Sequence, residues 1–142
     1  MYDFELLTAT SLQEAVTALQ DEETQALAGG QTLIPTMKQR LASPERLVSL
    51  TKIKALQGVT ATAQEVVIGA AARHADVAVE AAAFFPALAD LAGHIGDPAV
   101  RNRGTIGGSL ANNDPSACYP AAALGSGATI VTNAREIAAD DY

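Results

Sequence analysis

A glycine-rich stretch, residues 101–115, carries the densest set of residues suited to ligand binding in this sequence. Three glycines fall within five positions there, and Gly107 and Gly108 are adjacent. Thr105 and Ser109 place hydroxyl groups on either side of this pair. Glycine permits a positive φ and lets a ligand approach the main chain, and successive N–H groups can converge on the oxygens of an anion. A tight surface turn is the plainer interpretation, but the flanking hydroxyl and amide side chains favour an anion-binding loop. We term residues 104–109 the second glycine run.

The first glycine run, residues 28–32 (Ala-Gly-Gly-Gln-Thr), lies at the junction of a predicted strand and a predicted helix. Residues 24–28 suit a strand, and Leu33, Met37 and Leu41 then recur on one helical face. A helix N-terminus exposes free N–H groups and a partial positive charge, so it is a natural site for phosphate. The spacing matches neither a Rossmann fingerprint nor a Walker loop. A plain strand-to-helix turn therefore stays the alternative.

The first part of the chain alternates between short apolar runs and helical periodicity. A capping box, in which Ser11 caps the helix and Glu14 reaches back, begins a helix over residues 11–20. The order strand, helix, strand, helix, strand predicts a small α/β lobe with parallel pairing. We assign residues 1–55 to this lobe, with strands at 4–7, 24–28 and 46–50.

The pattern changes after residue 55, and residues 56–142 predict an α+β lobe with an antiparallel sheet. Two pairs of β-rich runs indicate hairpins, and three further segments are typical of helices. The hairpins are expected at 59–62 with 66–69 and at 128–132 with 135–138, and the helices at 75–83, 84–94 and 119–124.

The only histidines of the chain are His74 and His94. Neither has a cysteine or a second histidine at metal-ligand spacing, so we expect no metal site. We expect His74 to cap a helix or to lie on the surface. His94 precedes the second glycine run and is a candidate ligand contact.

Composition and charge exclude several classes of function. The chain has 142 residues, 49% of them hydrophobic, and a formal net charge of −7. An acidic chain lacks the basic face that nucleic-acid binding needs, and no apolar run reaches the length of a membrane span. Cys118 is the only cysteine, so neither an intrachain disulfide nor an iron–sulfur cluster held by four cysteines of this chain can form. We expect a cytoplasmic protein.

The two glycine runs together resemble those of a known family. Residues 28–35 (AGGQTLIP) and 95–110 (IGDPAVRNRGTIGGSL) look like the two FAD loops of the medium subunit of molybdenum hydroxylases, such as aerobic carbon monoxide dehydrogenase and xanthine dehydrogenase. The resemblance covers residues 1–142. It implies a PCMH-type α+β fold of two lobes with FAD between them, in which the main chain of residues 28–32 and 105–109 binds the pyrophosphate.

The resemblance also implies further cofactor contacts and a role for the chain. Ile95 would lie near the flavin or the adenosine part, and Asp114 on the adenosine side. The chain would carry no catalytic residue, because a molybdenum-bearing large subunit oxidises the substrate, an iron–sulfur small subunit relays electrons and the flavin passes them to an acceptor. The implied FAD-binding residues are Ala28, Gly29, Gly30, Gln31, Thr32, Leu33, Ile34, Ile95, Thr105, Ile106, Gly107, Gly108, Ser109 and Asp114.

Two departures from the family pattern keep other interpretations open. The acidic residue that the family usually has a few positions past Asp114 aligns with Cys118. Family members also continue beyond the position of Tyr142, with more of the second lobe and a C-terminal domain that we expect to be absent here. The chain is then either an FAD-binding electron-transfer subunit, or a truncated non-catalytic module that keeps the partner contacts but binds FAD weakly or not at all. An unrelated nucleotide- or phosphate-binding domain is a third interpretation.

Overall fold

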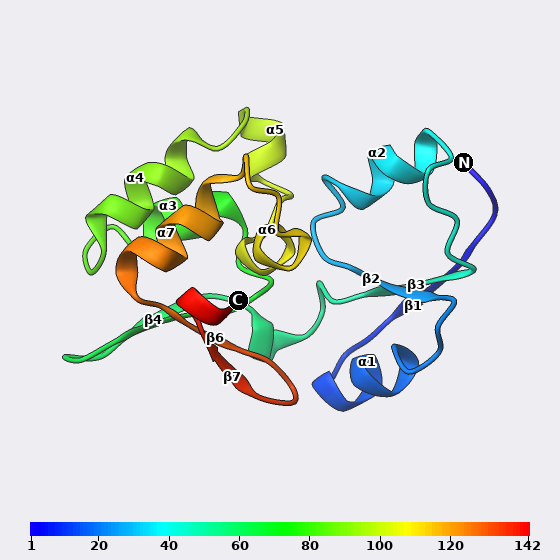
Figure 1. The fold of residues 1–142 in the computed structure, drawn as a ribbon, viewed down its shortest axis with the longest axis horizontal. Coiled ribbons are helices and arrows are strands. Elements are labelled where there is room, and N and C mark those ends of the chain that lie inside the picture. Colours follow the sequence, from blue (N-terminus) through cyan, green and yellow to red (C-terminus); the bar gives the residue numbers. More distant parts are fainter.

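The computed structural model describes residues 1–142, which fold into two lobes (Figure 1). The elements of the first lobe are β1 (Glu5–Thr8), α1 (Leu12–Ala18), β2 (Thr24–Leu27), α2 (Leu33–Lys38) and β3 (Arg46–Ser49). The three strands form a parallel sheet in the order β1-β3-β2. The two helices lie on opposite faces of this sheet (Figure 1), as right-handed crossovers that run in opposite directions along a sheet require.

Successive residues of the central strand β3 point to opposite faces and anchor one helix each. Val48 packs with Ala15 and Ile53 in an apolar cluster on the α1 side. Leu47 is also fully buried and, because side chains alternate along a strand, it faces α2, where Met37 is buried. This packing holds the sheet with its carboxyl ends toward the second lobe (Figure 1).

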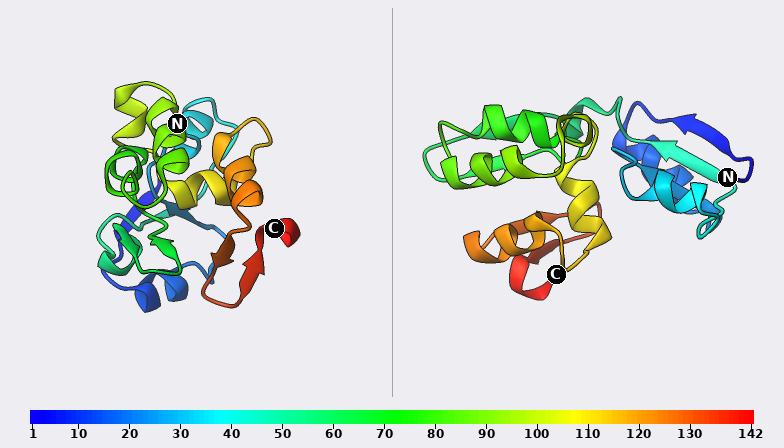
Figure 2. Two further views of the ribbon diagram at one scale, coloured as in Figure 1. Left: turned by 90° about the vertical axis from the view of Figure 1, so that its left-hand side faces the viewer. Right: turned by 90° about the horizontal axis from the view of Figure 1, so that it is seen from above.

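The second lobe combines two antiparallel hairpins with five short helices, and the right-hand view of Figure 2 shows it beside the first lobe. Its elements are the 3-10 helix η1 (Lys54–Leu56), β4 (Val59–Ala61), β5 (Val66–Ile68), α3 (His74–Glu80), α4 (Pro86–His94), α5 (Pro98–Arg101), α6 (Ile106–Asn112), α7 (Cys118–Ser126), β6 (Thr129–Val131), β7 (Glu136–Ala138) and the 3-10 helix η2 (Ala139–Asp141). The apolar core, which includes Val77, Leu88 and Tyr119, lies among α3, α4 and α7. None of the helices combines the length and the apolar character that a membrane span needs.

The fold class expected from the sequence is confirmed: a small parallel α/β lobe is followed by an antiparallel α+β lobe. Both hairpins are present. The helical segment expected at residues 84–94 begins at Pro86, because proline suits the first turn of a helix and interrupts any helix that continues into it.

The second glycine run is mostly helical, which corrects the expectation of a loop. Helix α6 begins at Ile106, and the hydroxyl oxygen of Thr105 accepts a hydrogen bond from the Gly108 amide at 3.1 Å, as an N-cap does. Ile106 and Leu110 pack against the core of the second lobe. Burial of these apolar side chains offsets the low helix propensity of the two glycines.

The helix that follows the first glycine run is shorter than its apolar pattern predicts. Helix α2 ends at Lys38, and Arg40 has a left-handed φ of +62°. Leu41 therefore lies beyond the helix and is 74% exposed. The pattern is misleading because Leu41 keeps the helical spacing although the chain has already turned.

The cap of α1 forms as expected: Ser11 accepts a hydrogen bond from the Glu14 amide, and the Glu14 carboxylate reaches back to the main-chain amide of Thr10, at 2.8 Å. One polar residue differs from expectation. His74 is neither a cap nor a surface residue: Arg73 is the N-cap, and His74 is the first residue of α3 and only 5% exposed.

Candidate functional site

The first glycine run leaves a series of main-chain N–H groups without partners inside the protein. It follows the carboxyl end of β2 and leads into α2, and no N–H group of residues 28–32 donates a hydrogen bond within the chain. Gly30 has a φ of +72°, a conformation that other residues rarely adopt. Gln31 and Thr32 are exposed. Consecutive free donors at the start of a helix suit an anion.

The second glycine run offers fewer main-chain donors than its sequence predicts. The amides of residues 106–109 all donate inside the protein, the first two to carbonyls of residues 70–72 and the others to Thr105. The amide of Thr105 and the hydroxyl of Ser109 make no hydrogen bond within the chain. These two groups, rather than a full ring of amides, are the donors that this run can present to a ligand.

The glycines of the second run serve close packing, not a special backbone conformation. None of them has a positive φ, so the positive φ that glycine permits is not used in this run. A Cβ built on Gly107 would lie 2.6 Å from the carbonyl oxygen of Ala70, and one built on Gly104 would lie 2.5 Å from Nε2 of His74. The absence of side chains at these positions brings α6 and the preceding turn against their neighbours.

Main-chain contact joins the two glycine runs. A Cβ built on Gly29 would collide with the carbonyl of Arg103 and would lie 2.7 Å from the Cα of Gly104. A Cβ built on Gly108 would lie 3.8 Å from the Cβ of Ala28. Figure 1 shows α6 beside the segment that connects β2 to α2. Two stretches far apart in the sequence therefore form one surface between the lobes.

This surface fits an elongated anion with groups on either side. The first glycine run supplies free N–H groups, and the second run adds two groups without a partner inside the chain, the amide of the buried Thr105 and the hydroxyl of Ser109. Gly108 is exposed, so a ligand can approach the start of α6. No group of three or more His, Cys, Asp or Glu side chains is arranged to hold a metal ion.

The segment that leads into the second glycine run is held by its own hydrogen bonds. Arg101 donates to the carbonyls of Ile95 and Gly96, at 3.4 and 2.8 Å, and Asp97 caps α5. Gly96 has a φ of +58°, and Ile95 packs partly into the core of the second lobe. Sequence reasoning missed the role of Arg101 because its partners are main-chain carbonyls, which leave no residue pattern.

The remaining candidates of the second lobe lie on its surface. Asp114 is exposed and accepts a hydrogen bond from the amide of Ser116 at 2.8 Å. Cys118 is the exposed first residue of α7. The side chain of His94 is 79% exposed, and its Nδ1 lies 2.8 Å from the carbonyl oxygen of Asp90. The structure thus places His94 within its own helix rather than at the glycine runs.

His74 and Tyr119 form a buried aromatic pair that sequence reasoning did not identify. Their ring centroids lie 5.3 Å apart, and the two residues are 5% and 1% exposed. Burial lowers the pKa of His74 and raises the pKa of Tyr119, so both side chains are neutral near pH 7. Neither Nδ1 of His74 nor the hydroxyl of Tyr119 has a hydrogen-bond partner.

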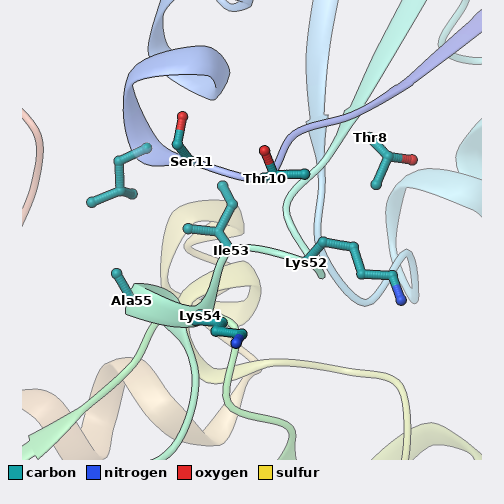
Figure 3. Close-up of a pocket in the computed structure, with 8 residues that line it drawn as sticks. Thr8, Thr10, Ser11, Lys52, Ile53, Lys54 and Ala55 are labelled. Atoms are coloured by element: carbon teal, nitrogen blue, oxygen red, sulfur yellow. The ribbon is translucent and has the colours of Figure 1, made fainter.

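An open, mainly apolar groove of about 850 Å³ lies apart from both glycine runs. In Figure 3 it lies between the segment that leads into α1 and the segment that follows β3. Its lining residues are Thr8, Thr10, Ser11, Leu12, Lys52, Ile53, Lys54 and Ala55. The hydroxyl of Thr10 and that of Ser11 already bond to Glu14. We therefore place the candidate site at the glycine runs.

The two-lobed fold, with glycine runs meeting between the lobes, is that of PCMH-type FAD-binding proteins, and solved structures share it. A chain of carbon monoxide dehydrogenase from Hydrogenophaga pseudoflava, in a structure that lacks the Mo-pyranopterin moiety of the molybdenum cofactor, matches with a TM-score of 0.93 and 38% identity, over 98% of this chain and 51% of that chain. Quinoline 2-oxidoreductase from Pseudomonas putida 86 gives a TM-score of 0.93 and 33% identity, over 99% of this chain and 52% of that chain.

Curated relatives point to the same family. The carbon monoxide dehydrogenase medium chain of Hydrogenophaga pseudoflava is 40% identical over 125 residues, which are 85% of this chain and 44% of that protein. The glyceraldehyde dehydrogenase medium chain of Sulfolobus acidocaldarius is 35% identical over 147 residues, or 99% of this chain and 52% of that protein. The chain thus spans about half the length of these relatives.

Residues 2–142 match the family described as the FAD binding domain in molybdopterin dehydrogenase. The chain belongs to this family, and the cofactor of the family is FAD. The resemblance of the sequence to medium subunits of molybdenum hydroxylases is confirmed, and its relatives are subunits of oxidoreductases. The interpretation as an unrelated nucleotide-binding domain is therefore wrong.

Proposed function

We propose that this chain holds FAD between its two lobes and passes electrons from iron–sulfur clusters to an external acceptor, as the medium subunit of a molybdenum hydroxylase complex. The observation that carries the proposal is the row of unpartnered N–H groups in residues 28–32, which lies against the second glycine run at Gly29. A diphosphate needs several donors from more than one direction, and this junction provides them.

The residues present fit the diphosphate of FAD. Its oxygens would accept hydrogen bonds from the amides of residues 28–32 on one side and from the Thr105 amide and the Ser109 hydroxyl on the other. The exposed Gly108 would let the ligand approach α6. The other proposed contacts, which flank this junction in the sequence, are Leu33, Ile34, Ile95, Ile106, Gly107 and Asp114.

The residues of the chain bind and orient the cofactor, and they do not react themselves. FAD, when bound, supplies the redox chemistry. The proposed partners are a molybdenum-cofactor large subunit and an iron–sulfur small subunit. The names of the relatives support this proposal, because they describe medium chains or a subunit of a dehydrogenase complex. A cytoplasmic location is part of the same proposal. The alternative, a truncated module that binds FAD weakly or not at all, draws no support from the two glycine runs, which are both present and in contact.

An absorbance spectrum of the purified full chain tests the cofactor directly. We expect flavin bands, either as purified or after reconstitution with FAD and removal of the excess. A thermal-shift panel with FAD, ATP and NAD serves as the control for specificity, and FAD should give the largest stabilisation. A chain without flavin bands after reconstitution, or one stabilised more by ATP or NAD, would overturn the proposal. Co-purification of the partner subunits while flavin is absent would favour the non-catalytic module.

A further inference from the structure

The core of the second lobe holds two polar atoms that its packing does not explain. Nδ1 of His74 and the hydroxyl of Tyr119 are buried and have no hydrogen-bond partner, although their rings are in contact at 5.3 Å between centroids. A buried polar group without a partner destabilises the folded state. Because these polar atoms have no partner, a role of His74 has to come from the volume and the position of its ring rather than from a hydrogen bond of Nδ1.

His74 lies directly beneath the turn that meets the first lobe. Its main-chain amide donates to the carbonyl of Gly104 at 3.0 Å, and the amide of Ile106 donates to the carbonyl of Ala72 at 3.1 Å. The Nε2 edge of its ring faces Gly104, because a Cβ built there would lie only 2.5 Å from Nε2. The His74 ring and this pair of hydrogen bonds therefore fix the position of the turn relative to the start of α3.

Gly29 contacts the same turn from the first lobe. It contacts the carbonyl of Arg103 and the Cα of Gly104. The order of contacts is then the first glycine run, the turn at 103–104, the ring of His74 and the ring of Tyr119. A side chain of different size at position 74 would therefore shift the turn relative to Gly29.

We propose that His74 is a positioning residue of the FAD site, whose imidazole acts as a spacer that sets the distance between the two glycine runs, with Tyr119 as its support. This inference rests on the proposed FAD site. The spacer acts by its volume, so a ring of similar shape should replace it and a small side chain should not.

A double-mutant cycle on FAD affinity tests the spacer. His74→Ala should weaken FAD binding at least ten-fold, which is a loss of about 1.4 kcal/mol or more in binding free energy. His74→Phe should stay within about three-fold of the wild type, because its ring has a similar shape.

Gly104→Ala should weaken binding at least ten-fold as well, because its methyl group would meet the His74 ring. The double variant should bind more tightly than additivity predicts. Additive losses, or an unchanged affinity in His74→Ala, would overturn the proposal. Val79→Ala, on the exposed face of α3, is the control and should leave affinity and melting temperature unchanged.

Hydrogen exchange in the absence of FAD separates this inference from the proposed function. The amides of Ile106 and Gly107 should exchange at least ten-fold faster in His74→Ala than in the wild type, whereas the amide of Ala89 in α4, which donates to the Phe85 carbonyl, should change much less. A uniform change at all three amides would indicate simple core filling and would overturn the spacer. Failure of the wild type to bind FAD would instead overturn the proposed function, and the exchange result would still decide the role of His74.

Discussion

At the scale of single residues, Gly30 is where backbone geometry and the proposed ligand contact coincide. Its φ of +72° is closed to proline, and its amide is among the free donors. Gly30→Pro should therefore reduce FAD affinity at least a hundred-fold or abolish it. Gln31→Ala is the matched control, and it should change the affinity by less than about three-fold because the main chain makes the contact. Calorimetric titration with FAD measures both, and a severe Gln31→Ala with a mild Gly30→Pro would reverse the assignment.

Cys118 is the residue at which the chain departs from its family, and its substitution tests whether this position contributes to FAD binding. An aspartate here would restore a carboxylate that can accept a hydrogen bond from the adenosine part, worth about 1.5–3 kcal/mol. Cys118→Asp should tighten FAD binding roughly ten- to one-hundred-fold. Because Cys118 is exposed at the first position of α7, the new charge needs no buried partner and favours the helix N-terminus. The melting temperature should hold or rise. Cys118→Asn is the control, and an equal affinity in all three proteins would place the position outside the site.

The burial of His74 predicts that the stability of the protein depends on pH. Its pKa is lowered by burial, so the unfolded chain takes up a proton at a higher pH than the folded chain does. The stability that the neutral ring allows is complete above the unfolded pKa of about 6.5 and is lost as the pH falls below it. Urea denaturation between pH 7.5 and 5 should show a smaller loss in His74→Phe than in the wild type. Parallel pH profiles of the two proteins would show that His74 stays accessible to protons.

At the scale of elements, helix α6 contains two adjacent glycines whose surroundings differ. Gly107 packs on the main chain of Ala70, whereas Gly108 is exposed and only the hydroxyl oxygen of Thr105, at 2.9 Å, is close to an added Cβ. Gly107→Val should lower both FAD affinity and stability, the latter by about 1–3 kcal/mol, because it overpacks a tight contact. Gly108→Val should weaken FAD binding at least ten-fold with a smaller loss of stability. Equal losses of stability in the two variants, measured by urea denaturation beside FAD titration, would contradict this division.

The sequence predicted most elements, because each has a local signal. The strand-to-helix junction at 28–32 follows from a β-rich run and a helical period, and both hairpins follow from paired β-rich runs around polar turns. Helix α6 was missed because glycines dominate its first turn, although burial of Ile106 and Leu110 outweighs their low propensity. The contact of Gly29 with Arg103 could not be predicted, since it depends on how two distant segments pack.

At the scale of the whole molecule, the proposed cofactor site depends on the contact between the lobes. The parallel sheet presents the first glycine run at its carboxyl end, and the second lobe presents the turn before α6. Neither lobe alone supplies donors on both sides of a diphosphate. The family resemblance predicted two lobes around FAD, but the division of donors between them, with most from residues 28–32, comes from the structure.

The measurement that tests this account most directly is the FAD affinity of Gly29→Ala in the full chain. The added methyl group would collide with the main chain at Arg103 and Gly104, which cannot move aside as a flexible side chain can, so the two glycine runs would be forced apart. The matched control is Gly93→Ala in α4, where an added Cβ meets nothing within 4 Å. We expect Gly29→Ala to bind FAD at least ten-fold more weakly than both the wild type and Gly93→Ala. A Gly29→Ala protein that folds and binds FAD as tightly as the control would contradict a site between the two runs.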